Sequence, residues 1–246
     1  MTATLQCCAE EFLLYLDAVK GLSENSVTAY RNDLSHLILF LGGDRFITSV
    51  TAENIRSCIG NLSREKKAAS TINRFIAAVR TFFAYCRRFE YIQTNPALEI
   101  RTMRMPRHLP RFLTGLEVDE LCNEPEKHEI LWQARDSAII EMLYSSGCRV
   151  SELASLKFDD MAEDYSSAVV TGKGKKDRRV YFEEDARNAF RIYLNDRKKL
   201  FADKHMNDTV SQIFVNQQGT ALTPHGIQWI VARYSGPEGT NHHISP

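Results

Sequence analysis

The sequence LYSSGCRVSELASL, residues 143–156, decides how the second half of the chain can fold and what it can bind. Residues 134–144 carry apolar side chains at the spacing of a helix with one buried face. The sequence Ser-Ser-Gly at 145–147 ends that helix, and helical spacing resumes at once from Val150. Arg149 is therefore predicted to lie in a tight corner between two helices, near the amino end of the second.

Arg149 is an unexpected residue for this corner. The amino end of a helix carries partial positive charge and unpaired N–H groups, so it favours acidic or small polar residues. A guanidinium there is explained if the corner binds an anion, because the arginine fork and free N–H groups both suit phosphate oxygens. The alternative is that Arg149 bends back onto Glu152, or onto a carbonyl, as part of the surface. The corner alone does not decide between these interpretations.

A basic hairpin is predicted farther along the chain. Residues 167–171 and 178–182 are rich in β-forming side chains, and GKGKKD at 172–177 joins them. A lysine-rich tip of this kind is usually a solvated loop. A nucleotide-binding P-loop is excluded, because the pattern G-x-x-x-x-G-K-[ST] is absent and no helix follows directly.

The amino-terminal part is predicted to be helical. Apolar residues at helical spacing predict helices over residues 10–20, 23–41, 51–62 and 72–86, and Ser23 and Thr51 are natural caps. The arc that the apolar stripe of the last helix leaves free contains basic residues at Arg74, Arg80, Arg87 and Arg88. Taken alone, such a face is typical of a solvated helix.

A basic connector divides the chain. RTMRMPRHLPR, residues 101–111, contains two prolines and four arginines, so it is expected to be extended rather than helical. We therefore expect one domain at residues 1–100, a linker at 101–113 and a second domain at 114–246. The second domain is predicted to begin with a capping box at Thr114 and Glu117. Its later elements are a helix at 186–200, a short strand at 213–215 and a helix opened by Thr223-Pro224.

Composition limits the class of protein. With 43% hydrophobic and 25% charged residues, the chain has enough apolar side chains to form buried cores. The formal net charge is zero, so any affinity for nucleic acid must depend on local patches. The six cysteines and seven histidines show no metal-ligand spacing, and we expect no metal or cofactor. No signal peptide or membrane-spanning run is found, which predicts a cytoplasmic protein that does not enter membranes.

The chain resembles the tyrosine recombinases, particularly their Xer-type and phage-integrase group. The resemblance rests on GCRVSEL at residues 147–153, followed by VVTGKGKKDRRV at 169–180, and on the domain order. It implies a mainly α fold. An amino-terminal SAM-like helical DNA-binding domain would precede a mixed α/β catalytic domain that is mostly helical and has a small β-hairpin sheet.

The resemblance also implies roles for individual residues. Arg149 would bind the non-bridging oxygens of the scissile phosphate, Lys173 would protonate the leaving 5′ oxygen, and Glu152 would be the acidic support residue. Lysine suits that transfer because it can lose a proton once it is desolvated beside other cations. Further basic residues would contact DNA phosphates and add affinity rather than sequence choice: Arg74, Arg80, Arg87, Arg88, Arg104, Arg107, Lys175, Lys176 and Arg178.

The substrate that the resemblance implies is double-stranded DNA. The implied partners are further recombinase protomers, which form a tetramer on DNA in the family. A tyrosine attacks a DNA phosphodiester without metal or nucleotide and forms a 3′-phosphotyrosyl link, so that strands can be rejoined to a new partner.

The family pattern stops at the end of the sequence. In the family, a segment like Ile244-Ser245-Pro246 is followed by H-x-L-R-H, another His or Trp, and the tyrosine nucleophile, and these motifs are absent here. We therefore expect a C-terminally incomplete catalytic domain that is inactive alone, because such residues act as a unit. The alternative is a catalytically dead DNA-binding module that occupies recombination sites or pairs with an intact recombinase. A helical interaction protein unrelated to DNA would leave the Arg149 corner and the Lys173 hairpin unexplained.

Overall fold

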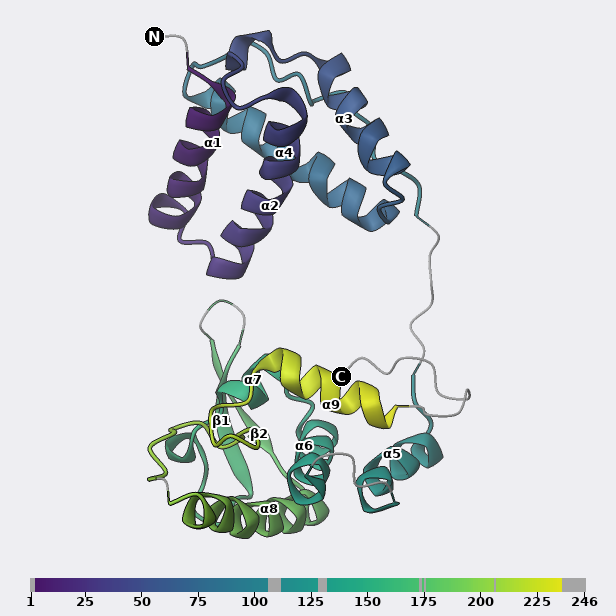
Figure 1. The fold of residues 1–246 in the computed structure, drawn as a ribbon, viewed down its shortest axis with the longest axis vertical. Coiled ribbons are helices and arrows are strands. Elements are labelled where there is room, and N and C mark those ends of the chain that lie inside the picture. The colour runs from purple at the N-terminus through teal and green to yellow at the C-terminus, as the bar shows by residue number, and fades with distance from the viewer. Residues whose placement is uncertain are drawn as a thin grey trace. The chain divides into compact units, whose positions relative to one another are not determined.

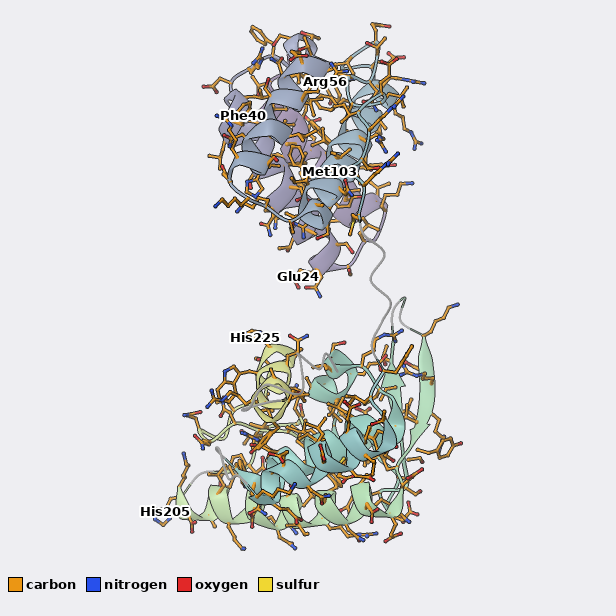
Figure 2. All side chains as sticks on the ribbon, turned by 90° about the vertical axis from the view of Figure 1, so that its right-hand side faces the viewer. Glu24, Phe40, Arg56, Met103, His205 and His225 are labelled. Carbon is orange, nitrogen blue, oxygen red and sulfur yellow. The ribbon has the colours of Figure 1, made fainter. Side chains whose placement is uncertain are left out.

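The chain forms two compact units, residues 1–109 and 110–246, each with its own hydrophobic core. A computed structural model describes residues 3–105, 112–127, 132–172, 174, 176–205 and 207–235. Both units are mainly helical (Figure 1), and Figure 2 shows their side chains. Within the described ranges, none of the helices combines the length and the apolar character that crossing a membrane requires.

The first unit is a bundle of helices. Helix α1, Leu5–Leu14, continues into one π-helical turn at Tyr15–Val19, and α2, Glu24–Leu41, runs back beside it. Helices α3, Ala52–Arg64, and α4, Ala69–Arg88, complete the bundle, with a short 3-10 turn at Ile47–Ser49 before α3. The predicted caps are present: the Ser23 hydroxyl accepts a bond from the Ser26 N–H, and the Thr51 hydroxyl accepts one from the Asn54 N–H.

Helix α4 supplies much of the first core. Its apolar stripe is buried from Ile72 to Cys86, and it packs against α1, α2 and α3. Phe82 lies edge-on to Phe12 of α1, with the ring centroids 5.6 Å apart. Edge-to-face contacts of this kind add to the free energy gained by burying the rings. The periodicity of residues 72–86 therefore predicted the correct buried face.

The second unit is a group of helices with a small hairpin sheet at one side, where β1 contacts α7 and β2 contacts α6 (Figure 1). Helix α6 packs along α8, and helices α5 and α9 pack against α6. A 3-10 turn at Phe158–Asp160 leads into the sheet. The elements are α5 at Gly115–Lys127, α6 at Gln133–Ser146, α7 at Val150–Ser155, β1 at Ser167–Thr171, β2 at Asp177–Tyr181, α8 at Glu184–Asp203 and α9 at Pro224–Tyr234. The predicted fold class, mainly α with one hairpin sheet, is confirmed.

The hairpin has the predicted location and a defined register. Strands β1 and β2 are antiparallel, and Val170 lies opposite Arg178. Side chains of β1 and β2 such as Ala168, Val170 and Val180 are buried in the second core. Beyond the last strand pair, the Gly172 N–H donates to the Lys176 carbonyl at 2.8 Å and continues the ladder toward the tip. The second strand begins at Asp177, one residue earlier than predicted.

The segment predicted as a strand at 213–215 is not one. It is extended and makes single β-bridges, from Gln212 to Lys157 and from Val215 to Ala221. Buried Arg197 of α8 holds this segment instead. Its Nη1 donates to the Gln212 carbonyl at 2.6 Å, and its Nη2 donates to the Val210 carbonyl at 3.0 Å. Backbone bonds also hold the segment: the Ile213 N–H donates to the Leu156 carbonyl and the Leu222 N–H donates to the Phe214 carbonyl, both at 2.8 Å.

Candidate functional site

The corner between α6 and α7 is formed as predicted. Gly147 ends α6 in the left-handed conformation with φ of 57°, which glycine adopts without steric cost. Cys148 follows, and its N–H donates to the Ser146 hydroxyl at 3.2 Å. Arg149 is then the extended N-cap residue of α7, with φ of −72° and ψ of 151°. Its side chain is 63% exposed, so the guanidinium is accessible from solvent.

Glu152 is the buried centre of the site. Its carboxylate is 3% exposed and accepts bonds from the Arg149 N–H at 2.7 Å and the Arg149 Nη1 at 2.8 Å. Arg178 of β2 donates from Nη1 to Oε1 at 2.7 Å and from Nη2 to Oε2 at 2.9 Å. These donors, with Arg178 first, lower the pKa of Glu152 to about 2, although burial opposes the change. Glu152 is therefore a carboxylate at neutral pH.

Arg149, Glu152 and Arg178 form what we call the carboxylate cluster. The two guanidinium groups flank one carboxylate, and the Arg178 side chain is 40% exposed. Gly172 of the hairpin packs directly against them. A Cβ on Gly172 would lie 3.2 Å from Glu152 Oε1 and 3.5 Å from Nη1 of each arginine. Glycine suits this position because a Cβ would be tight against Glu152 Oε1, so that the carboxylate would have to shift by a few tenths of an ångström.

The two interpretations of Arg149 prove compatible. Its guanidinium bends back onto Glu152, as the surface interpretation expects, and it remains exposed, as an anion-binding group must be. The predicted residues Arg149 and Glu152 lie together. Lys173 and Lys175 lie outside the described residues, as does Arg107. Lys176 is exposed beside the start of β2. The catalytic and DNA-binding assignments of these residues stay predictions.

Arg178 has a contact that the sequence did not reveal. The resemblance implies that Arg178 contacts DNA, whereas its guanidinium forms a fork on Glu152. The position of Glu152 in the sequence is the signal that could have predicted this ion pair. A carboxylate on the buried face of a helix needs a cation or several N–H groups, and one exposed Arg149 would satisfy it incompletely.

Two of the α4 arginines bind other parts of the first unit. Arg74 donates to both carboxylate oxygens of Asp33 in α2, at 3.0 to 3.3 Å, and Asp33 is 2% exposed. Arg80 donates from Nη2 to the Ile100 carbonyl at 2.6 Å and holds the chain after α4. The Arg74 side chain nevertheless remains 56% exposed. Its contact with Asp33 leaves part of the guanidinium facing solvent.

The remaining basic residues of this face are exposed. Arg87 and Arg88 lie in the last turn of α4, and Arg88 is placed over the ring of Phe89, 5.9 Å from its centroid. Arg104 is exposed in the connector. Just before it, Asn73 of α4 exchanges two bonds with the backbone of Met103, at 2.9 and 2.7 Å (Met103 is labelled in Figure 2). This part of the connector is therefore bound to α4.

A separate hollow of about 770 Å³ lies between α5, α6 and α8. It is lined by six carboxylates, those of Asp119, Glu126, Glu141, Glu183, Asp185 and Asp196. Such a surface repels phosphate, so we do not take this hollow as the site for an anionic substrate. Within the described part of the chain, His, Cys, Asp and Glu side chains form no group of three that could hold a metal ion.

Comparison with protein families matches both halves of the chain. Residues 9–89 match the phage integrase N-terminal SAM-like domain, and residues 111–246 match the phage integrase family. The second match covers more than half of the sequence and includes the carboxylate cluster.

Curated relatives are similar over nearly the whole chain. Tyrosine recombinase XerC of Treponema denticola is 36% identical over 245 residues, which cover 96% of this chain and 80% of the relative. Tyrosine recombinase XerC of Alcanivorax borkumensis is 32% identical, with 96% of this chain and 75% of the relative covered.

Solved structures share the fold at low sequence identity. The Tn1549 transposon integrase in complex with transposon right end DNA has a TM-score of 0.74 at 15% identity, covering 99% of this chain and 82% of that one. A lambda integrase tetramer bound to a Holliday junction has a TM-score of 0.72 at 16% identity, covering 98% and 66%. At this level of identity the likeness concerns the fold.

Proposed function

The chain belongs to the phage integrase family of tyrosine recombinases, and we propose that its carboxylate cluster binds a phosphodiester of double-stranded DNA during site-specific recombination. The observation that carries this proposal is the pairing of two solvent-accessible guanidinium groups with one buried carboxylate. Their formal charges leave one positive charge in excess at the protein surface. An accessible, preorganised cation of this kind suits a phosphate whose negative charge increases during reaction.

The chemistry follows from the residues around that phosphate. Arg149 binds the non-bridging oxygens, while Glu152 holds the arginine in place. In the cleavage step a tyrosine hydroxyl gives up its proton to a general base and its oxygen forms a bond to phosphorus, while the bond from phosphorus to the 5′ oxygen breaks. The 5′ oxygen leaves with a proton from Lys173, and the 3′ phosphate remains on tyrosine. In rejoining, a 5′ hydroxyl reverses these steps with a new strand.

A polypeptide of these 246 residues is proposed to bind DNA without cutting it. The histidine, second arginine and tyrosine motifs of the family have no counterpart in the printed sequence. Residues of such a site act as a unit, so the remaining groups supply little cleavage. The second candidate function follows directly: a module that occupies recombination sites, or pairs with an intact recombinase, without catalysis. Both functions place the protein with DNA in the cytoplasm.

Exposed basic residues supply the remaining affinity. Arg87, Arg88 and Arg104 in the first unit, and Lys176 beside the hairpin tip, are positioned in solvent where phosphates can reach them. Each phosphate contact releases counterions, so affinity falls steeply as salt rises. Further recombinase protomers are the proposed protein partners on the DNA.

A pair of measurements tests this function. Fluorescence anisotropy with a random-sequence 40-bp duplex, repeated over a salt series, should give an affinity that decreases linearly on a log–log plot. Failure to bind at low salt would exclude both candidate functions. A library of nicked duplexes that trap a phosphotyrosyl adduct distinguishes DNA cleavage from DNA binding. The 246-residue polypeptide should form no adduct, and adduct formation would overturn the proposal that it binds without cutting.

A further inference from the structure

We propose that Arg178 is a positioning residue, which neutralises Glu152 so that the guanidinium of Arg149 keeps its charge for a phosphate anion. The inference rests on the proposed function, because it concerns how the same cluster binds phosphate. It gives Arg178 a different task from the DNA contact expected of it, since the residue acts on Arg149 through the shared carboxylate.

The hydrogen bonds to Glu152 are distributed unequally between the two arginines. Arg178 approaches as a fork, with one Nη on each carboxylate oxygen at 2.7 and 2.9 Å. Paired N–H groups of this kind give the strongest guanidinium–carboxylate geometry. Arg149 donates from one nitrogen of its guanidinium to Oε1, and its side chain is the more exposed, 63% against 40%. Arg178 is thus the main counterion, and Arg149 can turn toward solvent.

Because Arg178 is the main counterion of Glu152, the cluster keeps a positive charge on Arg149 that a phosphate can bind. A carboxylate that is 3% exposed requires a cation, because an unpaired buried charge is very unfavourable. Without Arg178, the cation paired with Glu152 among the residues that the structure describes would be Arg149, and this pair would be neutral. A phosphate would then have to displace a buried carboxylate from Arg149. With Arg178 present, the cluster keeps one positive charge and no such exchange is needed.

The hairpin fixes Arg178 in this position. Arg178 pairs with Val170 across the sheet, and Val170 is buried in the second core. The backbone of Gly172, in the same hairpin, lies against Glu152 and both arginines. The guanidinium of Arg178 is therefore supplied from a packed strand rather than from a free loop. Such support from a rigid element is what holds a binding group in its productive orientation.

Titration of the 246-residue chain with inorganic phosphate, followed by the Arg149 side-chain N–H signal in NMR, tests the inference directly. The wild type should respond to phosphate. Arg178→Met should weaken its apparent affinity by roughly tenfold, because one unit of nearby positive charge is lost. Arg178→Lys keeps that charge and should fall between the two. In the double variant Arg178→Met/Glu152→Gln the competing carboxylate is also gone, and affinity should return to within about twofold of wild type.

Arg179→Met is the matched control, since it removes an arginine from the next position of β2 outside the cluster. Its side chain reaches Ser167 at 3.3 Å, and phosphate affinity should stay unchanged. Thermal melts of all variants establish that each is folded. The double variant distinguishes an effect of charge from an effect on structure. If Arg178 merely held the hairpin in place, replacing Glu152 as well would not restore phosphate affinity.

Each result bears on the inference. Wild-type affinity in Arg178→Met, or weak binding in the double variant, would overturn it, as would the absence of any Arg149 response in the wild type. The duplex titration reports separately on the proposed function. A chain that binds duplex DNA but shows no effect of Arg178→Met refutes the inference alone. A chain that responds to phosphate but does not bind duplex DNA refutes the proposed function.

Discussion

Removing the negative charge of Glu152 should make the second unit less stable at neutral pH, and the difference should disappear in acid. The pKa of Glu152 is lowered from its ordinary 4.5 to about 2, chiefly by the Arg178 fork. A carboxylate with a depressed folded-state pKa stabilises the fold above its unfolded pKa, and that stabilisation is lost as pH falls through the folded value. The full effect corresponds to about 3 kcal/mol of unfolding free energy.

The pH window follows from the same two values. Relative to pH 7, linkage predicts that Glu152 loses about 0.8 kcal/mol of its contribution at pH 4 and about 2 kcal/mol at pH 3. The variant Glu152→Gln has no such group, so the stability gap between wild type and variant should narrow by those amounts. The contribution of Glu152 at pH 7 is its ion pairing with the two arginines, which the lowered pKa expresses as a free energy.

Urea denaturation followed by tryptophan fluorescence measures this gap. Both tryptophans of the chain, Trp132 and Trp229, belong to the second unit, so the signal reports on the unit that contains Glu152. Glu163→Gln, at an exposed position, is the matched control and should leave stability nearly unchanged at every pH. A gap between wild type and Glu152→Gln that stays constant from pH 7 to pH 3 would refute the reasoning.

Three other substitutions have defined outcomes. Arg74→Met should lower the stability of the first unit by about 2 kcal/mol, measured by amide hydrogen exchange, because buried Asp33 loses its bidentate partner. Tyr234→Phe removes a 3.0 Å bond to buried Asp136 and should cost the second unit about 1 kcal/mol in urea melts; an unchanged midpoint would contradict it. Gly172→Ala should weaken phosphate binding while costing about 1 kcal/mol or less, because its Cβ would crowd the carboxylate cluster.

Local signals in the sequence predicted the elements that position the site. The caps at Ser23, Thr51 and Thr223 and the capping box at Thr114 are all formed. The end of α6 at Gly147 was also predictable, because one residue in the left-handed conformation decides it. Such features depend on neighbours within about one helical turn, which is the range over which a single sequence is informative.

The partners of the arginines could not be predicted in this way. Arg74 and Asp33 are 41 residues apart, and Arg178 and Glu152 are 26 apart. Which carboxylate an arginine meets depends on how helices and strands pack, and helical spacing shows only that the residue avoids the core. The prediction of a strand at 213–215 was wrong for the same reason. The apolar side chains of this segment are compatible with a strand, but its hydrogen bonds go to separate parts of the unit. The Ile213 N–H donates to the Leu156 carbonyl, and the Ile213 carbonyl accepts from buried Arg197.

The formal net charge of zero is a poor guide to what this chain binds. At physiological ionic strength, exposed charges separated by more than about 8 Å are largely screened, so a phosphate responds to the groups near it and not to the total. Carboxylates gather in the hollow of α5, α6 and α8, while the carboxylate cluster joins α7 to β2 and carries an excess positive charge. Opposite charges that cancel in the composition can thus dominate at different sites of the second unit, and the cation of Arg149 depends on the counterion that Arg178 provides for Glu152.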